Sequence, residues 1–162
     1  MTTELSSRIV MQAKLDQLPK LERWVEALAV EFLLSPSLVH RIDLCLSELV
    51  TNLIGYGYPG RAVGTVSIHG WRQGEQIVIR IDDDGIAFDP TSYVSPGLPS
   101  SLAEAAVGSR GIRLVRHFAD ALHHVRRVDG NELTLIFRSS GARAHSPAAA
   151  AARHSVSLDS VR

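Results

Sequence analysis

The chain has 162 residues, of which 45% are hydrophobic and 21% charged, and its 17 basic residues balance its 17 acidic residues. This length suits one domain with a disulfide-free core, and the neutral balance argues against a basic nucleic-acid surface. The single cysteine and the absence of signal-like or membrane-length apolar runs predict a cytoplasmic protein with no direct nucleic-acid or membrane partner.

The first half of the chain predicts a strand, two helices and a pair of strands. Apolar residues recur at helical spacing in two segments, and the second opens with Ser35-Pro36, an N-cap followed by proline at the first helical position. Two later segments alternate as strands around a turn at residues 73–75. The expected elements are a strand over residues 8–15, a helix over 20–34, a helix from Pro36 that ends by residue 60, and strands over 63–72 and 76–82.

The second half predicts a long loop, a helix and a hairpin. Residues 85–108 lack periodicity and contain three prolines, which is typical of a functional lid or of a disordered segment. A helix is expected over 111–118, followed by strands over 121–128 and 132–138 joined across Asp129-Gly130-Asn131. We expect one domain over residues 1–138 and a disordered tail over 139–162.

This order of elements predicts an α+β fold, a two-layer sandwich with helices on one face of a mixed, mostly antiparallel sheet. GxxxxGK[ST] is absent. GYGYPG at residues 55–60 matches GxGxxG, but it ends a predicted helix and does not lie between a strand and a helix, which argues against a dinucleotide-binding site.

Glu48 and Asn52 are four residues apart on the second predicted helix, so their side chains share a face. The Asn52 amide oxygen suits Mg²⁺, which takes few protein ligands, and the Glu48 carboxylate can accept a hydroxyl proton during phosphoryl transfer. This pair alone is more typical of a solvated helix face. Its position before a glycine-rich break and two strands favours the functional interpretation.

Asp83 follows an apolar strand and precedes Gly85, which lets the backbone approach a ligand closely. Asp and Gly also favour turns, so an ordinary strand-to-turn junction is the alternative. A carboxylate here can accept a hydrogen bond from the amine of adenine. Asp82 and Asp84 are neighbouring candidates that the residues alone leave open.

Gly108-Ser109-Arg110-Gly111 precedes the third predicted helix. Free backbone N–H groups at a helix start can bind phosphate, and Arg110 can add charged hydrogen bonds. The alternative is a simple loop-to-helix junction, which this segment alone would favour.

Together the three segments resemble, in order and spacing, the ATP-site motifs of the GHKL ATPase/kinase superfamily, over residues 8–138. The phrases ELVTN, DDGIAFDP and GIRLVRHFAD resemble its small anti-sigma-factor serine kinases of the RsbW and SpoIIAB type. The family pattern DxGxG selects Asp83 and aligns Ala87 with its second glycine. No residue of the last hairpin is assigned, because Gly130-Asn131-Glu132 lacks the Gly-Thr pair that relatives often place near adenine.

The resemblance implies a Bergerat-type ATP-binding fold, with ATP and Mg²⁺ as cofactors, Glu48 as the catalytic residue and Asn52 as the metal ligand. The implied nucleotide-binding residues are Asn52, Asp83, Gly85, Ala87, Gly108, Ser109, Arg110 and Gly111.

The implied function is a serine-protein kinase and anti-sigma regulator. It would phosphorylate a STAS-domain anti-anti-sigma protein, bind a sigma factor and form a homodimer. The alternatives are a catalytically weak, nucleotide-gated binding module, a histidine-kinase catalytic domain, and an ATPase clamp, which needs a transducer domain after the ATP site. Among other residues, His117, His123 and His124 are expected to be structural or on the surface, and Trp24, Phe32 and Cys45 to be buried.

Overall fold

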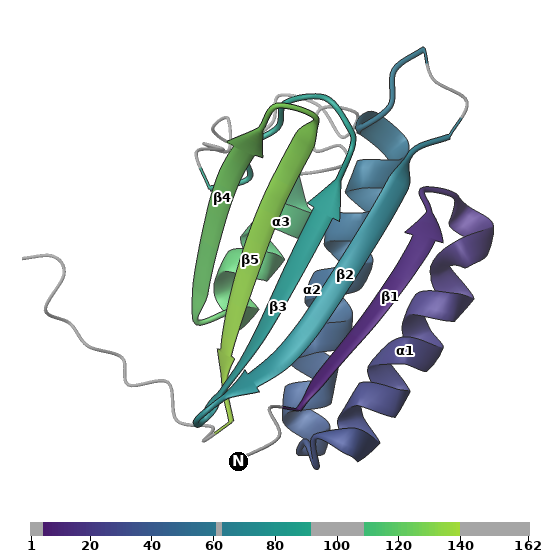
Figure 1. Ribbon diagram of the computed structural model, residues 1–162. Helices are drawn as coiled ribbons and strands as arrows, with labels where there is room; N and C mark the ends of the chain where they lie inside the picture. The colour runs from purple at the N-terminus through teal and green to yellow at the C-terminus, as the bar shows by residue number, and fades with distance from the viewer. Residues whose placement is uncertain (1–4, 61–62, 92–108, 140–162) are drawn as a thin grey trace, which may run out of the picture.

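The computed structural model describes residues 5–60, 63–91 and 109–139, and within them the chain forms a helical layer against a sheet (Figure 1). The elements in chain order are β1 (Ser6–Gln12), the 3-10 helix η1 (Leu15–Gln17), α1 (Leu18–Glu31), α2 (Pro36–Tyr56), β2 (Thr65–Gln73), β3 (Gln76–Asp83), α3 (Ser109–Phe118), β4 (Ala121–Arg127) and β5 (Gly130–Arg138).

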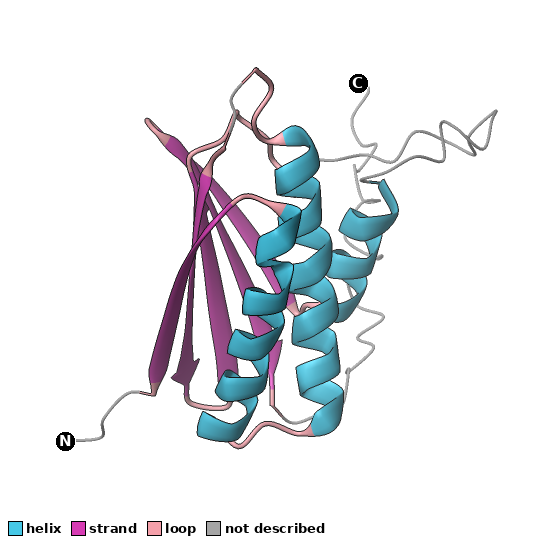
Figure 2. Cartoon of the chain, turned by 90° about the vertical axis from the view of Figure 1, so that its right-hand side faces the viewer, coloured by secondary structure: helices cyan, strands magenta, loops and turns pink. Residues whose placement is uncertain are grey.

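The five strands make one sheet in the order β1-β2-β3-β5-β4. The helices cover one face of it, as the side view in Figure 2 shows. The predicted two-layer α+β sandwich is therefore confirmed. All four strand pairings are antiparallel, so this sheet contains no parallel pair among the described strands.

The register aligns apolar residues in rows across the sheet. Ile9 pairs with Ile68, Ile68 with Ile81, and Ile81 with Leu133, and all four side chains are buried. Because side chains alternate between the faces of a strand, these rows give the sheet one continuous apolar face. The three helices pack against that face.

Helix α2 begins as its sequence predicts. Ser35 is the N-cap, its hydroxyl accepts a hydrogen bond from the Leu38 N–H at 3.4 Å, and Pro36 is at the start of the helix. Near the same end of α2, the Arg41 guanidinium donates to the Phe118 carbonyl at 2.7 Å and forms an ion pair with Asp120 at 2.9 Å. Arg41 thus connects the start of α2 to the end of α3.

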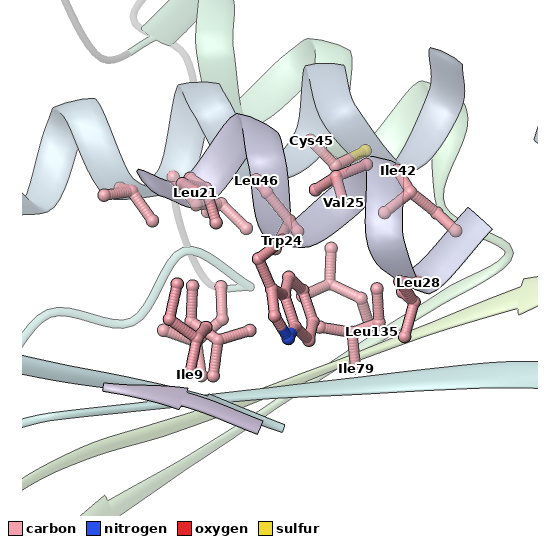
Figure 3. Close-up of a cluster of buried hydrophobic side chains, with 14 of the residues drawn as sticks. Ile9, Leu21, Trp24, Val25, Leu28, Ile42, Cys45, Leu46, Ile79 and Leu135 are labelled. Atoms are coloured by element: carbon pink, nitrogen blue, oxygen red, sulfur yellow. The ribbon is translucent and has the colours of Figure 1, made fainter. Parts of the chain in front are cut away.

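The core lies between the two layers. Trp24 of α1 points at the sheet among aliphatic side chains (Figure 3), and its indole N–H donates to Ser7 Oγ of β1 at 3.0 Å. Phe32 is 1% exposed and Cys45 is fully buried, so the three predicted core residues are confirmed.

The last hairpin differs from its prediction. Arg127 pairs with Gly130, so only Val128 and Asp129 connect the strands, and Asn131 belongs to β5 rather than to the turn. Gly130 lacks the positive φ of a turn glycine; a Cβ on it would lie 1.7 Å from the Asp83 carbonyl oxygen. Gly130 is needed because β5 approaches β3 closely at this point. In the sequence, a glycine needed for such an approach looks the same as a turn glycine.

Boundaries also shift at the N-terminus. The first strand ends at Gln12 rather than residue 15, and α1 begins at Leu18 with Pro19 in its first turn. The predicted lid over 85–108 is described only as far as Thr91. The predicted tail over 139–162 lies, apart from Ser139, outside the described residues.

Burial predicts the reactivity of Cys45. Its thiol is fully buried, and burial raises its pKa from 9.0 to about 12, although the nearby Arg41 charge acts in the opposite direction. A thiol reagent at mildly alkaline pH should therefore modify the folded chain at least about 10³-fold more slowly than the unfolded chain. The measurement compares labelling rates in buffer and in concentrated guanidinium chloride; comparable rates would contradict the buried position.

Candidate functional site

A pocket of about 220 Å³ opens between the helical layer and one end of the sheet. Its wall is mostly apolar, with polar side chains at only a few points, which is the usual composition of a small-molecule site. The lining residues are Leu49, Asn52, Leu53, Tyr56 and Gly57 of α2 and its end, Ile81 and Asp83 of β3, Ile86, Phe88 and Pro90 of the following segment, Ile112 of α3, His124 of β4, and Asn131 and Leu133 of β5.

Asp83 lies at the end of β3 and contributes a carboxylate to this pocket. Its Oδ1 accepts hydrogen bonds from the Gly85 N–H at 2.8 Å and from Asn131 Nδ2 at 3.0 Å. Burial raises the pKa of Asp83 above its usual value, and the hydrogen bonds from Asn131 and Gly85 limit that rise.

The two neighbouring aspartates have other partners. Asp82 forms an ion pair with Arg80 at 3.0 Å on the opposite face of β3, and Asp84 accepts a hydrogen bond from the Thr65 N–H at 2.8 Å. Of the three adjacent carboxylates, only Asp83 lines the pocket. Its role in binding adenine stays a prediction.

Glu48 and Asn52 meet the start of α3 at Gly111. A Cβ on Gly111 would lie 2.5 Å from Glu48 Oε2 and 3.0 Å from Asn52 Nδ2, so only glycine allows this approach without displacing them. Two of the three sequence segments are therefore adjacent in space, although about sixty residues separate them in the chain.

Asn52 has an unusual environment. Its Nδ2 is buried and has no hydrogen-bond partner; within residues 5–60, 63–91 and 109–139 it is the one buried side-chain polar atom of this kind. Buried amide atoms are nearly always paired, so this one is a candidate contact for a water, an ion or a ligand. A nucleotide with its metal ion fits this requirement, because an amide supplies either a donor or an acceptor when it rotates.

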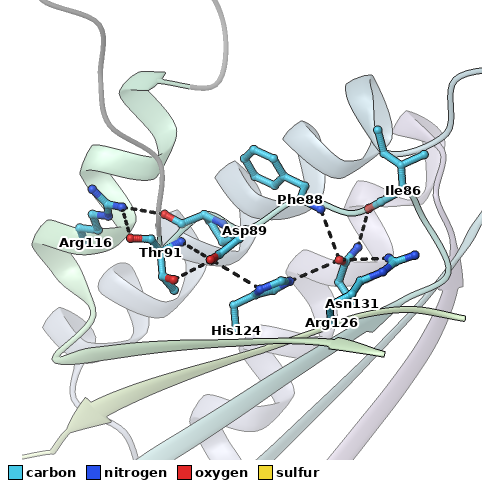
Figure 4. Close-up of polar contacts among 9 residues, drawn as sticks. Ile86, Phe88, Asp89, Thr91, Arg116, His124, Arg126 and Asn131 are labelled. Atoms are coloured by element: carbon cyan, nitrogen blue, oxygen red, sulfur yellow. Dashed lines mark hydrogen bonds and ion pairs between the residues drawn. The ribbon is translucent and has the colours of Figure 1, made fainter. Parts of the chain in front are cut away.

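The segment after β3 folds back along the pocket and is held at both ends. At its start the Ile86 N–H donates to the Gly57 carbonyl at 2.9 Å. At its end Arg116 of α3 donates to the carbonyls of Pro90 at 2.9 Å and Thr91 at 2.6 Å (Figure 4). The pocket wall thus depends on α2, β3 and α3 together.

The other sequence-predicted residues occupy different positions. Gly85 is buried, and a Cβ on it would lie 2.8 Å from the Gly57 carbonyl oxygen. Ala87 is exposed and does not line the pocket. Gly108 lies outside the described residues. Ser109 and Arg110 open α3, and their side chains are not among those described. Of the four residues predicted to bind phosphate, Gly111 is therefore the one whose surroundings the structure describes.

Sequence inspection missed Asn131 and His124. Asn131 was predicted in a turn, but it is buried on β5 beside Asp83. His124, which was predicted to be structural or on the surface, contacts Asn131 and Asp89 and also lines the pocket. The Gly130-Asn131 dipeptide resembles a turn in sequence, and only strand pairing reveals its position.

Two further properties concern metals and membranes. Within the described part of the chain, no group of three or more His, Cys, Asp and Glu side chains could hold a metal ion. None of the helices in the described ranges has the length and apolarity needed to cross a membrane.

Comparison with known proteins identifies the family. Residues 11–137 match the model of the histidine kinase-like ATPase domain, so the chain belongs to this family. ATP is the nucleotide that membership of this family implies.

Two curated relatives indicate where within the family the chain falls. It is 32% identical over 117 residues to the serine/threonine-protein kinase BtrW of Bordetella bronchiseptica, an alignment covering 72% of this chain and 82% of BtrW. It is 31% identical over 84 residues to the anti-sigma F factor of Clostridium beijerinckii, covering 52% of this chain and 59% of that protein. The predicted resemblance to RsbW and SpoIIAB-type proteins is confirmed.

A solved structure shares the fold. The crystal structure of the RsbU and RsbW domains of Rv1364c from Mycobacterium tuberculosis matches with a TM-score of 0.61 at 15% identity. The match covers 83% of this chain and 32% of that chain, so the protein described here spans about a third of that solved chain.

The contact at Gly111 predicts the effect of a single methyl group. Gly111→Ala should lower affinity for ATP about tenfold, because the new Cβ displaces the Glu48 and Asn52 side chains. Calorimetric titration with a non-hydrolysable ATP analogue measures this. Gly55→Ala on α2 is the matched control, since its Cβ would contact nothing within 4 Å. Equal losses in both variants would contradict a specific role for Gly111.

Proposed function

We propose that this protein is an ATP-dependent serine-protein kinase and anti-sigma regulator that phosphorylates a STAS-domain anti-anti-sigma protein. The observation that carries the proposal is the junction of α2 and α3, where Glu48 and the unpaired amide of Asn52 meet Gly111 beside an apolar pocket. The names of the relatives, a serine/threonine kinase and an anti-sigma factor, support this choice within the ATPase family.

In this proposal the base of ATP enters the apolar pocket. Leu49, Leu53 and Ile112 pack against its faces, and Asp83 accepts a hydrogen bond from its amine. The phosphates extend toward the start of α3, where Gly111 and the backbone N–H groups of the first turn lie. Gly108, Ser109 and Arg110 would complete this phosphate site.

Glu48 is the proposed proton acceptor. The substrate serine oxygen attacks the γ-phosphorus, its proton passes to the Glu48 carboxylate, and ADP leaves with the electrons of the broken P–O bond. Asn52, one turn further along the helix, would hold Mg²⁺ with the phosphates, and the ion would neutralise their developing charge. The unpaired atom of Asn52 is its Nδ2, so the amide would have to rotate to present its oxygen to the ion.

The partners follow from the same proposal. We propose that the protein acts as a homodimer in the cytoplasm and binds a sigma factor in addition to its STAS-domain substrate. The alternative, a nucleotide-gated binding module without kinase activity, lacks a reason to retain both Glu48 and Asn52 at the end of the pocket. Phosphate release without serine phosphorylation would instead indicate an ATPase.

Adenine binding should depend on Asp83. Asp83→Asn should weaken ATP binding by roughly 1–3 kcal/mol, because an amide pairs poorly with the amine of adenine and with the N–H groups of Gly85 and Asn131. Calorimetry on folded protein provides the measurement. Asp82→Asn is the control, since Asp82 pairs with Arg80 on the opposite face of the sheet. Unchanged affinity in Asp83→Asn would remove this residue from the site.

Phosphoryl transfer should depend on Glu48. Glu48→Gln should retain ATP affinity but lower serine phosphorylation by about 10²–10⁴-fold, because the amide cannot accept the proton. The assay incubates each variant with Mg²⁺-ATP and a STAS-domain protein encoded nearby, and scores phosphoserine by mass spectrometry. Glu26→Gln on the exposed side of α1 is the control. Phosphorylation at the native rate in Glu48→Gln would refute the catalytic assignment.

A further inference from the structure

Asn131 is the one buried polar residue in the described part of the chain, with 6% of its surface exposed. It is the second residue of β5 and pairs with Asp83 of β3 on one side and Arg126 of β4 on the other. A polar side chain in such a position is costly unless all its hydrogen bonds are made. The hydrogen-bond partners of the Asn131 side chain therefore indicate its role.

The partners fix the orientation of the Asn131 amide. Its Nδ2 donates to Asp83 Oδ1 at 3.0 Å and to the Ile86 carbonyl at 2.8 Å, and both partners can only accept. Its Oδ1 accepts from Arg126 Nη1 at 3.2 Å and from the Phe88 N–H at 3.4 Å, and both of these can only donate (Figure 4). Rotating the amide by half a turn would break all four bonds.

This fixed amide determines how Asp83 faces the pocket. Asn131 and the Gly85 N–H both donate to the same oxygen, Oδ1. The other carboxylate oxygen, Oδ2, is then the one available to a ligand in the pocket. Asn131 also binds the Ile86 carbonyl and the Phe88 N–H, so it couples Asp83 to the segment that forms the pocket wall.

The chemistry of purines gives this arrangement a consequence. Adenine carries an amine at the position where guanine carries a carbonyl oxygen. A carboxylate can accept from the amine but repels the carbonyl, whereas a protonated carboxyl group can donate to the carbonyl. When the base lies with this position toward Asp83, the choice between adenine and guanine depends on whether Asp83 remains an acceptor.

We propose that Asn131 is a positioning residue that keeps the Asp83 carboxylate a hydrogen-bond acceptor and thereby makes the pocket select adenine over guanine nucleotides. This inference rests on the proposed nucleotide site and names what determines its base specificity. Asn131 contributes through Asp83, and its amide stays neutral throughout.

The surroundings of Asp83 raise its pKa on balance, so the hydrogen bond from Asn131 is needed to limit that rise. Burial and the neighbouring Asp84 raise the pKa of Asp83, whereas the hydrogen bonds from Asn131 and Gly85 and the charge of Arg126 lower it. His124 of β4 contacts Asn131, and Asp89 of the segment after β3 contacts His124 in turn. Among the described side chains of α2 and α3, those that line the pocket are uncharged, and they include Asn52 and Ile112.

The test compares ADP and GDP binding over a range from mildly alkaline to mildly acidic pH. The variants are Asn131→Leu, which has a similar shape but no N–H group, and Asn131→Thr, which keeps one donor. Thr134→Val is the matched control, because Thr134 lies on the same strand three positions further on and faces the opposite side of the sheet. ADP and GDP carry the same phosphates, so their affinity ratio isolates the base.

We expect the native chain and Thr134→Val to prefer ADP at every pH. In Asn131→Leu the preference should fall about tenfold, and it should fall further as the pH is lowered, because the pKa of Asp83 rises without the Asn131 donor and the protonated form can bind guanine. Asn131→Thr should restore part of the preference. A purely structural role would lower both affinities together and leave their ratio unchanged.

The outcomes separate this proposal from the proposed function. If the native chain binds no adenine nucleotide, both are overturned. If it prefers ADP and Asn131→Leu retains the full ratio at every pH, only the role of Asn131 is overturned and the nucleotide site remains. Should Asn131→Leu fail to fold, Asn131→Thr decides: a native ratio at low pH overturns the proposal, and a reduced, pH-dependent ratio supports it.

Discussion

The burial of one face of α2 is the interaction on which the rest of the structure depends. Leu38, Ile42, Leu46 and Val50 are almost completely buried against the sheet, and this contact fixes the rotation of the helix about its axis. With the rotation fixed, Glu48 and Asn52 can point only toward α3 and the pocket. The same helix thus supplies buried side chains to the core and polar side chains to the candidate site. A rotation of α2 would therefore move both sets together.

Two glycines allow the elements around the candidate site to approach each other closely. Gly111 lets α3 approach the Glu48 and Asn52 side chains, and Gly130 lets β5 approach the end of β3. Arg41 and Arg116 then fix α3 at both sides, one through its final carbonyl and the other through the segment after β3. Elements that are far apart in the chain consequently converge beside the pocket at one end of the sheet.

The polar residues near Asp83 form a connected set rather than isolated pairs. Asn131 joins β3, β4 and the segment over residues 86–91, while His124 contacts both Asn131 and Asp89 (Figure 4). Buried networks of this kind are stabilising only when every member is paired. Asn52, by contrast, has a buried Nδ2 without a hydrogen-bond partner, which is why the proposal places a ligand beside it.

The amino-acid sequence was enough to predict the fold class, most of the helices and strands, and the shared helix face of Glu48 and Asn52, because helical spacing, strand alternation and motif order are local properties. It could not place Asn131 or His124, since their positions depend on which strands pair and on the register. It also could not choose among Asp82, Asp83 and Asp84 without a family pattern. The tertiary structure decided this, because side chains alternate along β3 and only Asp83 faces the pocket.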